Sequence, residues 1–198
     1  MRLTMDKYVR VRFATLAAFL ALGAFQLGAQ DRPMRQGSIE AILGGYNMNE
    51  PRFDAVYPGG GLLTGLGASA AIVSNLNLYL EAKYWQREGA LTFSKEPTTL
   101  RLFPISLGLR YIMPLDVINP YAGAGGDIYF YYEDNSIGTT INHASGFHLL
   151  GGAYLRFAKD LPLMLNLKVK YTWAKTTESG NSIQLGGFEY SVGIALAL

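Results

Sequence analysis

Large apolar side chains alternate with small or polar ones along the end of the chain, residues 185–198. The large residues fall on one face of an extended strand: Phe188, Tyr190, Val192, Ile194, Leu196 and Leu198. The opposite face carries Gly187, Glu189, Ser191, Gly193, Ala195 and Ala197. A period of two predicts a β-strand. An apolar face opposite a face of small residues with one carboxylate is typical of a strand that separates lipid from a polar interior.

Seven further segments are predicted to be strands, which makes eight in all. They cover residues 37–47, 64–73, 78–87, 105–111, 120–132, 143–157 and 163–172. The second segment is so rich in glycine and alanine that the sequence does not assign its two faces. Pro104 has no amide donor, so it predicts an irregularity where the fourth strand begins.

The predicted connections alternate between long and short. Long polar loops follow strands one, three, five and seven, at 48–63, 89–98, 133–142 and 175–182. Shorter turns follow strands two, four and six, at 74–77, 113–119 and 158–162. Long extracellular loops and short periplasmic turns are typical of transmembrane barrels. We therefore predict an all-β fold in which residues 37–198 form one eight-stranded antiparallel up-and-down transmembrane β-barrel.

Ten charged residues lie on the strand faces opposite the apolar ones. They are Glu40, Glu81, Lys83, Arg87, Arg110, Asp127, Arg156, Lys168, Lys170 and Glu189. A soluble barrel would bury the apolar faces and expose these charges. The glycines and alanines between the charges favour the opposite arrangement, a narrow filled interior with the apolar faces toward lipid. Aromatic residues near strand ends, at 84–85, 129–132 and 171–173, predict an interfacial girdle.

The first 30 residues are predicted to be a secretory signal peptide. Four basic residues precede an apolar run at 13–25, which is too short to span a membrane, and small residues follow at 28–30. Residues 31–36 are a short polar linker. Cleavage would remove four of 17 basic and one of 15 acidic residues and leave a net charge of −1, so no basic nucleic-acid footprint remains. The chain has no cysteine, which excludes disulfides and thiolate chemistry.

The signal peptide, the alternating strands and two motifs together resemble a known family. The motifs are the run 119–125, Asn-Pro-Tyr-Ala-Gly-Ala-Gly, and the run 187–193, Gly-Phe-Glu-Tyr-Ser-Val-Gly. They are similar to the small OmpA/OmpX-type outer-membrane β-barrel domains of Gram-negative bacteria, although such barrels usually end on an aromatic residue and this chain ends on Leu198. The resemblance implies a monomeric outer-membrane barrel. Its partners would be outer-membrane lipid and lipopolysaccharide, and the barrel-assembly machinery during insertion.

An eight-stranded barrel is only wide enough for its own side chains, so the inward charges should pair across the lumen and close it. Folding strand seven against strand eight places Lys168 and Lys170 opposite Glu189, and we expect ion pairs there. Such a plugged lumen predicts no large stable conductance. His148 also faces inward, but it has no matched ligands in the sequence, so we predict neither a metal site nor a cofactor.

His143 and Ser145 are the only residues that suggest catalysis. Their His-x-Ser spacing resembles that of outer-membrane lipid A deacylases, barrels of similar size in which a histidine activates a serine toward an acyl ester. The resemblance covers these two residues alone. The orienting carboxylate is expected downstream, but Asp160 lies in a turn at the other end of the barrel, and Glu133 and Asp134 are at the correct end but upstream. An acyl-ester hydrolase therefore remains an alternative to a non-enzymatic barrel.

Two non-enzymatic functions remain open. A structural or adhesive barrel would contact an extracellular ligand through loop residues such as Arg52, Phe53, Tyr57, Glu133 and Asp134. A conduit for small hydrophobic molecules would instead need an open upper lumen.

Overall fold

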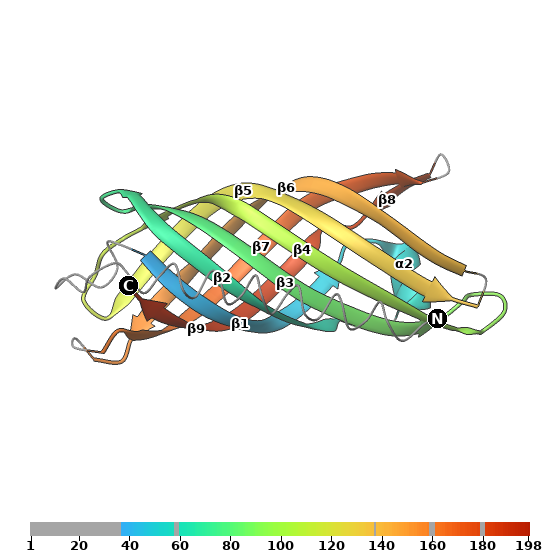
Figure 1. The fold of residues 1–198 in the computed structure, drawn as a ribbon, viewed down its shortest axis with the longest axis horizontal. Helices are drawn as coiled ribbons and strands as arrows, with labels where there is room; N and C mark the ends of the chain where they lie inside the picture. Colours follow the sequence, from blue (N-terminus) through green and yellow to red (C-terminus); the bar gives the residue numbers. More distant parts are fainter. Residues whose placement is uncertain (1–36, 58–59, 137, 159–160, 179–180) are drawn as a thin grey trace, which may run out of the picture.

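The structure is a computed structural model, and it describes residues 37–57, 60–136, 138–158, 161–178 and 181–198. The predicted signal peptide (1–30) and linker (31–36) lie outside these described residues. Tilted strands form a tall closed barrel, and the first and last strands of the barrel lie side by side (Figure 1).

The wall is built from antiparallel strands that pair in sequence order. These are β1 (Gly37–Met48), β2 (Gly61–Val73), β3 (Leu76–Ala90), β4 (Pro97–Ile112), β5 (Ile118–Asn135), β6 (Gly138–Arg156), β7 (Leu163–Glu178), β8 (Asn181–Gln184) and β9 (Gly187–Ala197). Both β8 and β9 pair with β7, and Leu185 and Gly186 separate them. The sheet closes because β9 also pairs with β1. The predicted eight-stranded barrel is confirmed, with β8 and β9 together forming its eighth strand.

Side chains alternate between the two faces of the wall as predicted. In β9, Phe188, Tyr190 and Val192 are 44–49% exposed, whereas Glu189 is 2% exposed. The structure also assigns the faces of β2, where Leu63 points inward and its neighbour Leu62 points outward.

A belt of exposed large apolar side chains surrounds the barrel. It includes Leu43, Leu66, Leu78, Leu80, Ile105, Leu107, Leu109, Ile128, Phe130, Phe147, Leu149, Leu167, Val169, Val192 and Ile194. A soluble monomer rarely exposes a continuous apolar surface of this extent, whereas a transmembrane barrel requires one. No helix in the described residues is long and apolar enough to cross a membrane.

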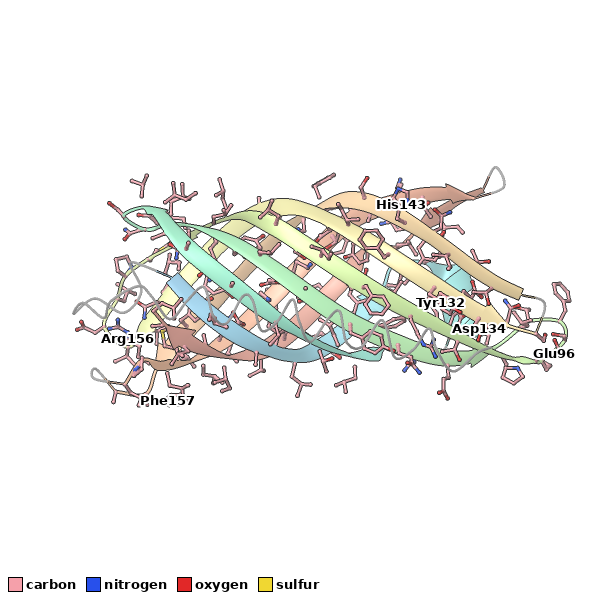
Figure 2. The ribbon with its side chains drawn as sticks, in the orientation of Figure 1. Glu96, Tyr132, Asp134, His143, Arg156 and Phe157 are labelled. Atoms are coloured by element: carbon pink, nitrogen blue, oxygen red, sulfur yellow. The ribbon has the colours of Figure 1, made fainter. Side chains whose placement is uncertain are left out.

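The polarity of the wall reverses beyond the belt, toward the end that carries Glu96 and Asp134 (Figure 2). In β4 the apolar residues Ile105 and Leu107 point outward, but Leu100 and Leu102, farther along the same strand, are buried inside. At this level the outer face carries polar side chains such as Arg101. This part of the wall therefore resembles a water-soluble barrel that continues above a membrane-spanning one.

Two of the predicted long loops are wrong for this reason. The loop predicted at 89–98 is present but shorter, because β3 ends at Ala90 and β4 begins at Pro97. Only residues 136–137 separate β5 from β6, and only 179–180 separate β7 from β8. The polar segments 133–142 and 175–182 form strands because backbone pairing continues where the outer face meets water.

The fourth predicted loop, 48–63, contains a helix that the sequence analysis missed. Helix α2 (Pro51–Val56) begins with proline, whose fixed φ suits the first helical position. It lies at the same end of the barrel as the extended strands (Figure 1).

The irregularity predicted at Pro104 is confirmed. The β3–β4 ladder pairs Ala82 with Ile105 and Trp85 with Leu102, but it omits the two pairs between them. The register is the same on both sides, so the defect is a local gap in the ladder.

Candidate functional site

The interior of the barrel is the candidate site because it gathers charged side chains that the alternation aims at the axis. Eight of the ten predicted lumen charges are at most 4% exposed. They comprise four carboxylates and four cations: Glu40, Glu81, Asp127, Glu189, Lys83, Arg110, Lys168 and Lys170. The formal charge of this buried set therefore cancels. Arg87 and Arg156 are half-buried nearer the two ends of the barrel.

A continuous series of ion pairs crosses the lumen. Lys168 Nζ lies 2.5 Å from Glu81 Oε1, and Lys83 Nζ lies 2.6 Å from both Glu81 Oε2 and Glu189 Oε1. The series ends at Lys170, whose Nζ lies 3.4 Å from Glu189 Oε2 and 3.1 Å from Asp127 Oδ1. Buried charges are tolerated when they are paired in this way.

The structure places only one of the two expected lysines beside Glu189. Lys170 pairs with Glu189 directly across the β7–β9 ladder. The expectation for Lys168 is wrong, because its register partner is Ser191 and its ammonium group pairs with Glu81 on β3. The lumen is narrow enough for a long lysine side chain to reach a strand that is not its neighbour in the wall.

Asp127 is surrounded by hydrogen-bond donors. His148 Nδ1 lies 2.8 Å from Asp127 Oδ2, the Thr172 hydroxyl donates to the same oxygen at 3.0 Å, and Ser106 donates to Oδ1. The other ring nitrogen of His148 bonds to the Tyr79 hydroxyl. His148 is thus part of the polar network, and the described residues contain no group of three or more acidic or histidine side chains that could hold a metal.

Arg110 and Glu40 lie at the end of this charged layer that is farther from α2. The Arg110 guanidinium faces three tyrosine rings, with its Cζ 5.1 Å from the ring centre of Tyr154, 5.4 Å from Tyr121 and 5.6 Å from Tyr79. Cation–π contacts of this kind stabilise a desolvated guanidinium. Glu40 accepts hydrogen bonds from Asn166 Nδ2 at 2.6 Å and from Tyr154 at 3.4 Å. The three tyrosines belong to one buried cluster inside the barrel.

An apolar cluster fills the other end of the lumen, which we call the mouth cluster. Its buried members are Tyr46, Met48, Tyr57, Leu63, Trp85, Leu100, Leu102, Tyr129, Tyr131, Ala144, Ala174 and Leu185. Phe53 of α2 packs on it, with its ring 4.6 Å from that of Tyr57 and 6.1 Å from that of Trp85. The barrel mouth is thus filled by side chains from the wall and from α2.

Tyr57, which follows α2, connects the helix to the wall. Its hydroxyl lies 2.9 Å from Thr98 Oγ1 on β4 and donates to Glu133 Oε1 on β5 at 2.9 Å. Burial raises the pKa of the Tyr57 hydroxyl above its ordinary value, and the nearby Glu133 carboxylate adds to that rise. The phenol therefore keeps its proton and remains a donor to Glu133.

The sequence analysis missed the mouth cluster and assigned three of its residues to the interfacial girdle. Trp85, Tyr129 and Tyr131 are at most 6% exposed and point inward, so that assignment is wrong. The alternation of side chains along β3 and β5 already places these three residues on the inward face. Among the outward aromatics, Phe147 stacks on Trp173, and Tyr171 meets Trp173 edge to face.

His143 and Ser145 lie on the outer face of β6 at the edge of the apolar belt, where they pair with Phe130 and Ile128 of β5. The His143 ring is 6.5 Å from the ring of Phe130. Among the described residues no carboxylate forms an ion pair with His143, so the orienting group of a hydrolase triad has no counterpart here.

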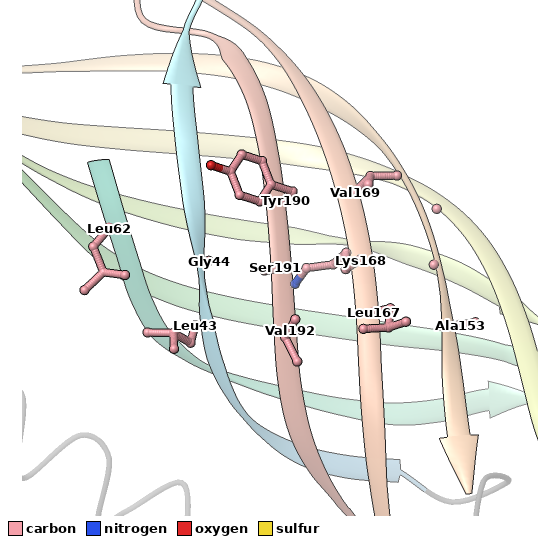
Figure 3. A pocket seen from close by; sticks show the side chains of 12 residues that line it. Leu43, Gly44, Leu62, Ala153, Leu167, Lys168, Val169, Tyr190, Ser191 and Val192 are labelled. Carbon is pink, nitrogen blue, oxygen red and sulfur yellow. The ribbon is translucent and has the colours of Figure 1, made fainter. Parts of the chain in front are cut away.

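A groove of about 670 Å³ opens on the lipid-facing wall (Figure 3). It is lined by residues of β2, β1, β9, β7 and β6, and it reaches from Leu62 on β2 to Gly151 and Gly152 on β6. It lies within the apolar belt, where lipid chains would cover it.

Comparisons with known proteins show what the fold resembles. No protein-family model matches the chain, and no curated protein sequence matches it. Among solved structures, the outer membrane protein OprG of Pseudomonas aeruginosa is 12% identical with a TM-score of 0.66, over 86% of this chain and 99% of its own.

Two further structures support the same comparison. The N-terminal β-barrel domain of Pseudomonas aeruginosa OprF and the outer membrane protein W of E. coli are each 14% identical to this chain. Their TM-scores are 0.57 and 0.55, and each match covers 84% of this chain and all of the other. With its closed topology and apolar belt, the chain has the fold of the small eight-stranded outer-membrane β-barrels.

Proposed function

We propose that the chain is an integral outer-membrane protein with a closed lumen, which serves a structural or adhesive role through its extracellular end. The observation that supports this proposal is that side chains from several strands meet inside the lumen at three levels. The mouth cluster, the ion-pair series and the tyrosines around Arg110 occupy successive levels of the lumen. An outer-membrane location is supported by the fold and by the apolar belt.

The extracellular end is assigned to the end that carries α2. The opposite end holds both ends of the barrel chain and the short turns at 74–75 and 113–117. Periplasmic turns of small barrels are short, and an even strand number returns the chain to the side where it began. The strands that continue beyond the belt then rise from the cell surface and are available to a partner.

Conductance in planar bilayers tests the closed lumen. If the ion-pair series closes the lumen as proposed, purified protein should give no steady channels of nanosiemens size. A variant with Phe53→Ala and Trp85→Ala tests whether the mouth alone is the barrier. It should also remain closed, since the ionic layer below is unchanged. Steady nanosiemens-scale channels from the unaltered protein would contradict the proposal.

Replacing residues 50–58 with a short glycine-serine linker separates adhesion from transport. This change removes α2 but leaves β1 and β2 intact. An adhesive barrel should lose cell attachment while solute sensitivity stays the same. Increased uptake of small hydrophobic molecules with unchanged attachment would favour a conduit instead.

We further propose that lipopolysaccharide and outer-membrane lipid contact the outer wall just above the belt. Arg101 on this surface lies over the ring of Tyr132, with Cζ 5.7 Å from the ring centre. A guanidinium and aromatic rings at this height suit lipid phosphates and the interface. Arg101→Ala should therefore weaken co-purification of lipopolysaccharide.

We also propose that the protein inserts as a monomer through the barrel-assembly machinery.

A further inference from the structure

The wall of the barrel splits above the membrane between β6 and β7. Pairing between these strands begins at Ser145 and Lys175. Farther from the membrane, β6 continues from Ala144 to Gly138 with β5 as its partner, and β7 pairs with β8. The two hairpins diverge, with β6 and β8 ending far apart (Figure 1). Within the described part of the chain, residues 138–144 of β6 have a neighbouring strand on one side only.

Hydrogen bonds at the base of the split show which backbone groups face the open side. The His143 amide donates to the side chain of Asn142, at 2.8 Å from Oδ1. The His143 carbonyl accepts a bond from the Thr176 hydroxyl at 3.5 Å. Two side chains thus occupy the positions that a neighbouring strand would normally fill. Because N–H and C=O of one residue point to the same side of an antiparallel strand, Thr139 and Ile141 present theirs to the same open edge.

We propose that this edge of β6 binds an extended segment of another protein as an added antiparallel strand. A row of backbone donors and acceptors at regular spacing is a template for a polypeptide backbone. The adjacent outer side chain favours an apolar contact, since Ile141 is 69% exposed although it lies above the lipid belt. The inference rests on the proposed function, because it names the chemistry of the partner at the extracellular end.

A second copy of the chain in the same membrane does not fit the edge. All copies insert with the same orientation, so β6 of every copy runs from the extracellular end toward the membrane. Antiparallel pairing needs the opposite direction. A two-fold axis along the membrane normal would also cross the two β6 strands at about 80°, twice their tilt. The occupant is therefore a segment of a different protein, whose direction the membrane does not fix.

The test uses a peptide with simple side chains, so that binding depends mainly on its backbone. A fluorescein-labelled heptapeptide, Lys-Thr-Val-Thr-Val-Thr-Lys, is titrated against the full protein in lipid nanodiscs, and fluorescence anisotropy gives the Kd. A peptide with N-methyl groups on alternate amides is the control, because it keeps the side chains but loses backbone donors. Binding of the first peptide and at least tenfold weaker binding of the second are expected.

Two variants of the edge should change the Kd in opposite directions. The pair Thr139→Pro and Ile141→Pro removes both amide donors and should weaken binding at least tenfold, whereas Ile141→Val should leave it unchanged. Asn142→Ala frees the His143 amide and should tighten binding about two- to tenfold, the gain from one hydrogen bond. Each variant must first show the heat-shifted gel migration of a folded barrel.

Several results would overturn the proposal: no binding of the unmethylated peptide, equal binding of the methylated one, or a Kd that none of the edge variants changes. Peptide binding reports on the edge and bilayer conductance reports on the lumen. The edge and the closed lumen can therefore fail independently.

Discussion

Glu189 is the residue that joins the two halves of the ion-pair series. It lies on β9 between Lys83, 2.6 Å away, and Lys170, 3.4 Å away, and it is 2% exposed. An ion buried in this way is held by its partners, because the desolvation that it suffers is offset only by nearby opposite charge. Removing one carboxylate would leave two lysines competing for the remaining ones.

Glu189→Gln should therefore lower the free energy of unfolding by about 3–5 kcal/mol, the usual cost of breaking a buried ion pair from one side. Urea unfolding in detergent micelles, followed by tryptophan fluorescence, measures the change. Glu88→Gln is the matched control, because Glu88 is exposed on the outer face of β3 and its loss should cost less than about 0.5 kcal/mol. Equal midpoints for the two variants would show that the series adds little to stability.

The elements show how far the alternation of apolar and polar residues predicts the wall. Strands within the belt follow the predicted phase because each has lipid on one side and a polar lumen on the other. The prediction ends where β4 passes from Ile105 to Leu102, since the apolar residues change from the outer to the inner face there. A window that spans such a reversal has no consistent period, and its polar residues therefore predict loops where the strands in fact continue.

The ion pairs show a second limit. The β7–β9 register follows from folding the two strands together, and it brings Lys170 and Glu189 into contact. The Lys168–Glu81 pair crosses the lumen between strands that are not neighbours. Such a contact depends on the barrel diameter and on how long side chains share the interior, which no local pattern in the sequence contains. Helix α2 was missed because six residues are too few to establish a helical period.

Tyr57 is the residue through which α2 attaches to β4 and β5. Tyr57→Phe keeps the ring contact with Phe53 but removes the hydrogen bonds to Thr98 and Glu133. The helix should detach more readily, by about 1–3 kcal/mol for the lost bonds, one of them to a carboxylate. Amide hydrogen exchange of residues 50–57 measures the local opening. Protection in β5 near the membrane should be unchanged, and equal protection of α2 in both proteins would contradict this role.

At the scale of the whole molecule, the barrel exists only if its first and last strands meet. β1 pairs with β9 from Ser38–Ala197 to Met48–Gly187, and no open edge remains within the belt. A wall edge left open in lipid would expose unpaired backbone groups, each at a cost of several kcal/mol. Closure is thus a condition for insertion. It requires the backbones of β1 and β9 to approach closely along this seam.

Gly44 makes that approach possible and provides the test. A Cβ atom at this position would lie 2.7 Å from the Cβ of Ser191 and would also meet the backbone of β9. Gly44→Val should therefore force β1 and β9 apart and destabilise the closed barrel by about 3 kcal/mol, despite the higher strand propensity of valine. The measurements are heat-modifiable gel migration and the urea midpoint. Leu43→Val is the control, because Leu43 is exposed on the outer face and its replacement should leave both measurements nearly unchanged. Normal folding of Gly44→Val would show that the seam can widen without loss of the barrel.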